Sequence, residues 1–169
     1  MKRVALILCG VCLLAAVAAG GASAFTRPAG VSIAGCIFAN GGQATVAAGT
    51  DVVLFVGDVT RRRGQAEAAM HNWSFALANV DGTPIFNPDS YWNTPIPDTN
   101  VVHNGVTYPD VWVTWWIYDT GVTLAAGETL TLDFNLVALH PGTDGFSRVD
   151  PLGPWPRQIV GGLCTITAA

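Results

Sequence analysis

Charged side chains are scarce in this sequence of 169 residues, where Asp, Glu, Lys and Arg together make up only 12% of the chain. Lys2 is the only lysine, and 12 acidic residues face 8 basic ones, for a formal net charge of −4. This balance lacks the basic surface that nucleic acids and anionic membranes attract, so it predicts neither as a partner. Half of the residues are hydrophobic, which excludes an intrinsically disordered chain, and the length fits one domain.

Long apolar runs are absent after the first 24 residues, and those residues have the three parts of a secretory signal peptide. Lys2 and Arg3 make a positive start, Val4–Ala19 form an uncharged apolar run, and small residues follow it. We predict a cleaved signal peptide over 1–24 and a single domain over 25–169, with no membrane-spanning segment in the mature chain. The alternative is a retained anchor, but the run is shorter than the roughly 20 residues that cross a bilayer. Cleavage removes two of the 8 basic residues and none of the 12 acidic ones, which leaves a net charge of −6.

Cysteine is also rare, and two of the four cysteines lie inside the signal peptide. The remaining pair, Cys36 and Cys164, is expected to form one disulfide, because thiols in an exported chain are oxidised. A competing hypothesis is a cell-surface lipoprotein, since Ile33–Cys36 matches the box at which bacterial lipoproteins are lipidated. In lipoproteins that box directly follows the apolar run, whereas Phe25–Pro28 intervene here, and lipidation would leave Cys164 unpaired. We therefore expect a secreted, extracellular protein.

Alternation of apolar and polar residues dominates the mature chain, and it is clearest over Thr129–Leu139, where every second residue is apolar. That pattern predicts a strand with one face in a core and one in water. Asp81-Gly82 between two β-prone runs predicts a tight hairpin. Gly64–His71 has the composition of a short helix. Strands are predicted over Val31–Phe38, Thr45–Thr50, Asp51–Val56, Trp73–Val80, Thr83–Phe86, Val111–Tyr118, Thr129–Leu139 and Leu163–Thr167. About seven or eight strands with one short helix favour an all-β, immunoglobulin-like antiparallel sandwich.

Several turn-and-strand motifs follow one another along most of the mature chain. They are the Ala-Ala-Gly turn before Val52–Val56, the Asp81-Gly82 hairpin, the Trp92 region, the Ala125-Ala126-Gly127 corner and the terminal Gly162-Leu163-Cys164. In these motifs the chain resembles a group of uncharacterised bacterial secreted proteins with immunoglobulin-like folds. The resemblance implies a β-sandwich and export, and it brings no catalytic residues with it.

Catalytic and metal-binding signatures are missing. His71, His103 and His140 are scattered along the chain and no Gly-x-Ser-x-Gly elbow occurs, so we predict a protein that is not an enzyme and holds no cofactor. No two histidines have the spacing of metal ligands. Loop carboxylates could bind calcium, but aspartate is an ordinary turn residue that needs no ion, and we predict no metal site. The carboxylates concerned are Asp89, Asp98, Asp144 and Asp150.

Aromatic residues are the most informative feature. Alternation over Val111–Tyr118 places Trp112, Trp116 and Tyr118 on one face of a strand whose other face is equally apolar. One hypothesis is that long proline-rich loops cover these rings with Tyr91, Trp92 and Trp155. The other is an exposed aromatic platform for a sugar ring or a partner chain, since such patches are unusual unless they bind something. The candidate binding surface consists of Trp112, Trp116, Tyr118, Tyr91 and Trp92.

These observations predict a secreted, non-catalytic, immunoglobulin-like binding domain whose ligand is an unknown protein or carbohydrate. One alternative is a structural subunit of an extracellular filament or surface layer, in which the partner is another copy of the chain and a free N-terminal arm exchanges strands. A second alternative is an enzyme with an unrecognised loop site, because a fold does not determine a function.

Overall fold

A computed structural model describes residues 28–99, 101–103, 106–146 and 156–169, and in these residues the chain is mostly β-structure. The predicted signal peptide, Trp155 and Asp150 lie outside the described residues. The strands are β1 (Val31–Ser32), β2 (Gln43–Val46), β3 (Asp51–Thr60), β4 (Trp73–Val80), β5 (Thr83–Pro84), β6 (Ile96–Asp98), β7 (Val101–His103), β8 (Val106–Tyr108), β9 (Val111–Thr123), β10 (Thr129–Ala138) and β11 (Arg157–Ala168). The helical elements are α1 (Arg63–Asn72), a π-helix η1 (Gly35–Ala39) and a 3-10 helix η2 (Pro88–Tyr91).

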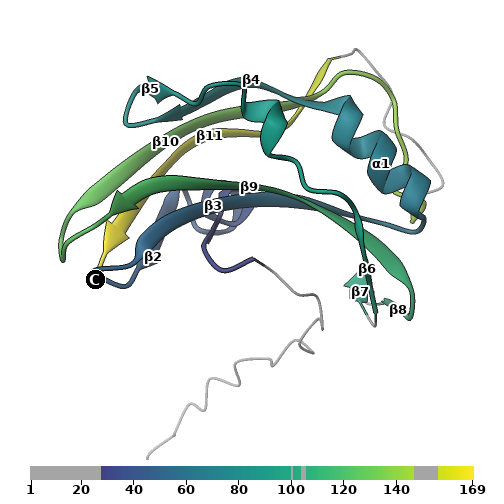
Figure 1. The fold of residues 1–169 in the computed structure, drawn as a ribbon, viewed down its shortest axis with the longest axis horizontal. Helices are drawn as coiled ribbons and strands as arrows, with labels where there is room; N and C mark the ends of the chain where they lie inside the picture. Colours follow the sequence, from purple (N-terminus) through teal and green to yellow (C-terminus); the bar gives the residue numbers. More distant parts are fainter. Residues whose placement is uncertain (1–27, 100, 104–105, 147–155) are drawn as a thin grey trace, which may run out of the picture.

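Two sheets form the two layers of the molecule (Figure 1). One has four strands in the order β1-β3-β9-β6, and the other has five in the order β2-β11-β10-β4-β5. The long neighbours are antiparallel, whereas the short strands β1 and β2 run parallel to β3 and β11. The first four strands of the chain therefore alternate between the sheets. The two layers are held together by side-chain packing, because no strand forms ladder hydrogen bonds in both sheets.

The main core lies between these layers. Every second residue of β10, from Leu130 to Leu136, is buried there, as the alternation predicted. Val52, Leu54 and Val56 of β3 face them from the other sheet. An all-β fold is thereby confirmed, because both sheets bury one face against each other while the polar residues of β10 point outward.

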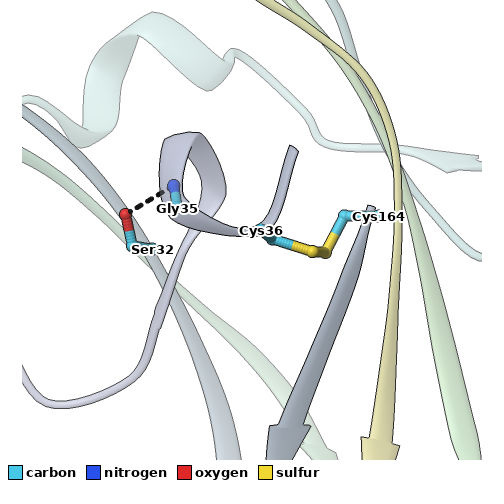
Figure 2. Close-up of a disulfide and its surroundings, with 4 residues drawn as sticks. All are labelled: Ser32, Gly35, Cys36 and Cys164. Atoms are coloured by element: carbon cyan, nitrogen blue, oxygen red, sulfur yellow. Dashed lines mark hydrogen bonds between the residues drawn. A yellow bond between two sulfur atoms is a disulfide. The ribbon is translucent and has the colours of Figure 1, made fainter. Parts of the chain in front are cut away.

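The disulfide joins Cys36 of η1 to Cys164 of β11, with Cα atoms 5.9 Å apart (Figure 2). The strand predicted over Val31–Phe38 is wrong beyond Ser32, because the chain turns into η1 to bring Cys36 against the second sheet. The Ser32 hydroxyl accepts the Gly35 N–H at 3.1 Å and stabilises the start of that turn.

The long proline-rich connection after β5 is structured, which raises the number of strands above the predicted seven or eight. It contains η2, the edge strand β6 and the hairpin of β7 and β8. Proline suits an edge strand because it cannot donate to a second neighbour. Val101 and Tyr108 of the hairpin pack on the outer face of β9, around Val111, Val113 and Trp115. Both faces of β9 are therefore covered, which explains why both are apolar in the sequence.

Candidate functional site: a cavity at one end of the two sheets

The site begins where the inward face of β3 changes from apolar to polar. The alternation that buries Val52, Leu54 and Val56 continues to Asp58 and Thr60. Thr60 is satisfied by donating its hydroxyl to the carbonyl of Arg62 at 3.0 Å. Asp58 instead faces a cavity at this end of the core. A carboxylate on the core-facing side of a strand is therefore the first residue of the candidate site.

Helix α1 closes this end of the molecule as it crosses from β3 in one sheet to β4 in the other, at the right of Figure 1. Gln65, Ala68, Ala69 and Asn72 line the cavity from the helix. They recur at the i, i+3, i+4 and i+7 spacing of one helix face. Because the two central residues are alanines, the helix leaves space beside the sheet ends instead of filling it. Ala66 points elsewhere and is fully buried.

The loop after β10 forms the opposite wall and is fastened to both ends of α1. The Asn72 amide donates to the carbonyl of His140 and accepts the His140 N–H, each at 2.7 Å. At the other end of the helix, the Arg61 N–H donates to the Asp144 carbonyl at 2.8 Å. These hydrogen bonds hold helix α1 and the loop after β10 in place on two sides of the cavity.

The cavity has a volume of about 680 Å³, which is within the range of sites for small organic ligands. The polar lining residues differ in exposure: Asp58, Gln65, Asn72 and Asp144 are partly buried, whereas His71, His140, Thr143, Arg157 and Gln158 are exposed. The described lining residues are Asp58, Gln65, Ala68, Ala69, His71, Asn72, Trp73, Ala138, His140, Pro141, Gly142, Thr143, Asp144, Arg157, Gln158 and Ile159.

Asp58 is the electrostatically unusual group of the site. Burial raises the pKa of its carboxyl from 3.8 to about 7, a hydrogen bond from the Val59 N–H opposes this, and the negative charge of Asp144 adds to it. The Val59 N–H lies 2.9 Å from the carboxylate. A carboxyl with a strongly perturbed pKa in a cavity is a common property of ligand-binding and catalytic sites.

Gln65 also lines the cavity, but its side-chain oxygen has no surface that a ligand could reach. Its side-chain oxygen is buried and has no hydrogen-bond partner among the described residues. Gly145 packs directly against this amide, since a Cβ there would lie 2.6 Å from the oxygen and 2.7 Å from the nitrogen. Leaving a buried carbonyl oxygen unpaired costs free energy, about 1–3 kcal/mol, so such an atom in a native protein calls for an explanation.

Two of the aromatic residues predicted as a binding surface, Trp116 and Tyr118, lie on the face of β9 that points between the sheets. Trp116 is fully buried, and its indole N–H donates to the Pro88 carbonyl at 2.6 Å. Trp116 is therefore unavailable to a ligand, which corrects its place in that surface. Tyr91 of η2 covers it, with ring centroids 6.2 Å apart, and also packs on Tyr118 at 5.0 Å.

The other two predicted aromatics are separated from this group. Trp112 is half-buried, with the guanidinium of Arg63 at 5.6 Å from its ring centroid. Trp92 packs edge-on against Trp73, a cavity-lining residue, at 5.8 Å. The five predicted residues thus do not form one exposed platform, and coverage by the proline-rich loop accounts for Tyr91 and Trp92.

The loop aspartates considered as calcium ligands make turn hydrogen bonds. Asp89 accepts the Phe75 N–H at 2.9 Å and the Ser74 hydroxyl at 2.6 Å, and so caps the exposed edge of β4. Asp98 accepts the N–H of the next residue, and Asp144 accepts the Phe146 N–H. In the part of the chain that the structure describes, no three His, Cys, Asp or Glu residues gather closely enough to hold a metal ion.

Of the three histidines, His71 of α1 and His140 line the cavity, although the sequence separates them widely. The structure describes the backbone of His103 only, in β7. Among the described helices, none is both long and apolar enough to cross a membrane.

No family model, curated protein or solved structure matches the chain, so its own geometry is what bears on its function. The sequence contains one signal for this site that the prediction of the binding surface did not include. In Asp51–Thr60 the inward positions change from Val52, Leu54 and Val56 to Asp58, and a charged residue in a core-facing position marks the end of a core or the wall of a cavity.

Proposed function

We propose that this protein is a secreted, non-catalytic binding domain with an immunoglobulin-like fold, and that its ligand enters the cavity between α1 and the ends of β10 and β11. The strand order supports the fold. One sheet contains the neighbours β3, β9 and β6, and the other contains β4, β10 and β11, with β5 added beside β4. This matches the division of strands in immunoglobulin domains, in which an extra strand extends the second sheet.

The resemblance to bacterial secreted proteins of this fold remains part of the proposal, as does export. The disulfide supports export, because such bonds persist in oxidising compartments. It joins the first and last strand regions, whereas immunoglobulins join two central strands across the core. The chain therefore uses its disulfide to fasten both terminal regions and leaves the far end of the layers open for the cavity.

The cavity of about 680 Å³ is the observation that carries the binding function. It is lined by the apolar residues Ala68, Ala69 and Ile159 and by a mixture of partly buried and exposed polar residues. That distribution is typical of sites in which apolar contact provides affinity and a few polar groups orient the ligand. The walls are fixed by hydrogen bonds within the protein, so little ordering entropy is lost when a ligand binds.

Solution NMR of the purified, isotope-labelled protein tests this function. The probes are methyl α-glucoside, 1-butanol, n-butylammonium and N-acetyl-lysine amide, and we expect at least one to shift the amide signals of cavity residues. Probes with five or so heavy atoms are expected to bind with a Kd on the order of 1 mM.

Ala68→Trp, which fills the cavity from α1, should abolish the binding. Ala126→Trp is the matched control, because Ala126 is exposed in the turn before β10, at the opposite end of the layers. Equal binding by the two variants, or no shift at the cavity with any probe, would refute the proposal. Concentration-dependent assembly or turnover of a probe in the same titrations would instead favour the filament or the enzyme hypothesis.

A further inference from the structure

The polar side chains that line the cavity between α1 and the loop after β10 are already hydrogen-bonded within the protein. The Asn72 amide is used twice, as a donor to the His140 carbonyl and as an acceptor of the His140 N–H. The Thr143 hydroxyl and the Asp144 carboxylate each accept a backbone N–H of their own loop. A polar ligand would have to compete with these bonds, so it would gain little from meeting the side chains that make them.

Gln65 and Asp58 offer a polar ligand no better partner. The Gln65 oxygen has no accessible surface, and Gly145 packs against its amide. Asp58 already accepts the Val59 N–H, and burial is the first cause of its raised pKa. A carboxyl that resists ionisation because of burial indicates surroundings of low polarity.

The remaining polar lining residues are exposed to solvent, and they are His71, His140, Arg157 and Gln158. Contacts with exposed polar groups add little net affinity, because water competes for the same groups. A charged or highly hydroxylated ligand would therefore give up its hydration on entering the cavity without gaining buried partners.

Apolar side chains, in contrast, reach the cavity from five segments of the chain. They are Ala68 and Ala69 of α1, Trp73 of β4, Ala138 of β10, Pro141 of the loop and Ile159 of β11. Ile159 is the extra residue of a bulge, since Leu136 pairs with Val160 and Val137 with Gln158. Bulges re-aim side chains, and this one coincides with an isoleucine in the cavity lining. Burial of hydrocarbon against these side chains is thus the main source of affinity that the cavity offers.

We propose that the cavity binds an uncharged small molecule whose body is mostly hydrocarbon, packed against Ala69, Trp73 and Ile159 and excluding water from Asp58. The inference rests on the proposed function and names the ligand class of the same site. A volume of about 680 Å³ accommodates a whole small molecule. A free molecule is therefore the expected source of the hydrocarbon, and an apolar peptide side chain is the alternative that the test separates from it.

The decisive comparison uses 1-butanol, n-butylammonium and butanoate, which have similar hydrocarbon chains and differ in charge. In NMR titrations of the purified, isotope-labelled protein at pH 6, we expect 1-butanol to bind at least tenfold more tightly than either ion, because a charge loses hydration without gaining a buried partner. In the series 1-propanol, 1-butanol and 1-pentanol, each added methylene should tighten binding about fourfold. Methyl α-glucoside should leave the cavity signals unchanged.

A variant of the apolar wall tests where the hydrocarbon lies. Ile159→Thr keeps a branched side chain at the bulge and replaces part of its hydrocarbon by a hydroxyl, so it should weaken 1-pentanol binding about three- to tenfold. Leu163→Thr is the matched control on β11, because Leu163 is 63% exposed and does not line the cavity. Thermal unfolding shows whether both variants are folded, and the probe series on the wild-type protein is decisive without them.

Asp58 links this binding to pH. A ligand that excludes water from the carboxyl makes its ionisation more costly still, so the affinity for 1-pentanol should fall by up to about tenfold as the pH rises from 6 to 8. Asp58→Asn should remove this dependence, and Asp133→Asn, on the outward face of β10, should retain it. The Asp58→Asn series also measures the contribution of the other titratable groups that face the site, which are Asp144 and His140 of the loop, His71 of α1 and Arg157 of β11. A wild-type affinity that does not change with pH would overturn the placement of the ligand against Asp58.

The outcomes separate this inference from the proposed function. If n-butylammonium, butanoate or methyl α-glucoside shifts cavity residues as strongly as 1-butanol, the hydrocarbon ligand class is overturned and the binding function stands. If no probe shifts the cavity, both are overturned. N-acetyl-leucine amide should bind no more tightly than 1-pentanol, and tighter binding would identify a peptide side chain as the ligand and overturn the assignment of a free molecule.

Discussion

Replacement of Asp58 by asparagine should make the protein more stable at alkaline pH, because the native side chain is an acid that is costly to ionise where it lies. Its pKa rises from 3.8 to about 7 on folding, first because of burial and then because of Asp144. Asparagine has the same shape and retains an oxygen that accepts the Val59 N–H. The variant therefore removes the ionisation and keeps the geometry.

The magnitude follows from proton linkage. Between about pH 4 and about pH 7 the folded protein keeps the Asp58 proton while the unfolded chain releases it. The stabilisation from this raised pKa is fully present below about pH 4 and is lost as the pH rises through about 7. A tenfold difference in acidity between the folded and unfolded states corresponds to about 1.4 kcal/mol, so the loss approaches about 4 kcal/mol. This is a large part of the roughly 5–15 kcal/mol by which domains are typically stable.

Urea unfolding followed by tryptophan fluorescence measures this effect, and the six tryptophans provide the signal. At pH 4 wild type and Asp58→Asn should unfold at similar urea concentrations. At pH 8 the variant should unfold at a concentration roughly 2 M higher, for a slope of about 2 kcal/mol per M. Asp133→Asn removes an acid from the outward face of β10 and serves as the control.

Equal stability of wild type and Asp58→Asn at pH 8 would refute the reasoning, because it would mean that the carboxyl ionises without cost and is well hydrated. A variant less stable than wild type at both pH values would show instead that the carboxylate makes essential contacts. In either case the description of Asp58 as a carboxyl that is costly to ionise in the folded protein would fail.

Two further predictions concern the fold. Replacement of both Cys36 and Cys164 by alanine opens a loop of 128 residues and should lower the free energy of unfolding by about 5 kcal/mol, as measured by urea titration. A loss below about 1 kcal/mol would show that packing alone holds the two terminal regions together. Gly57→Ala should lower the free energy of unfolding by about 1–3 kcal/mol or more, because the new Cβ would lie 2.8 Å from the Thr114 carbonyl oxygen and would overlap ring atoms of Trp115. The control is Gly64→Ala in α1, whose Cβ meets open space, and thermal unfolding should show it to be neutral or stabilising.

Strict alternation made Thr129–Leu139 predictable, because one face of this strand lies in the core, and it forms β10 over Thr129–Ala138. Trp73–Val80, expected from the β-prone run before Asp81-Gly82, forms β4 with the expected bounds. Such patterns determine which side chains are buried whatever the neighbouring strand is. The prediction was wrong over Val31–Phe38, where the chain satisfies a disulfide and a turn instead of a ladder.

The aromatic strand shows where this local reasoning ends. Alternation correctly divided Val111–Tyr118 into two faces, and both proved to be covered in β9. The positions of β10 and of the proline-rich loop decide which face of β9 meets the second sheet. The sequence of β9 alone does not determine those positions. The burial of Trp116 was therefore decided by packing between segments that are distant in sequence.

The candidate site was even less accessible to such reasoning. Asp58 occupies an inward position that is visible in the sequence, but the other residues of the cavity come from α1, the start of β4, the end of β10 with the loop after it, and the start of β11. His71 and His140 have no distinguishing feature as isolated sequence positions, and the hydrogen bonds between Asn72 and His140 bring their segments together.

The sequence alone determined a β-rich domain with one disulfide and few charges, because the period of apolar residues is a local property of the chain and only two cysteines lie outside the predicted signal peptide. The tertiary structure decided which surfaces are closed and which are hollow. A cavity exists only where several elements fail to fill the space between them, and here two alanines of α1, facing the ends of β3, β10 and β11, leave that space unfilled.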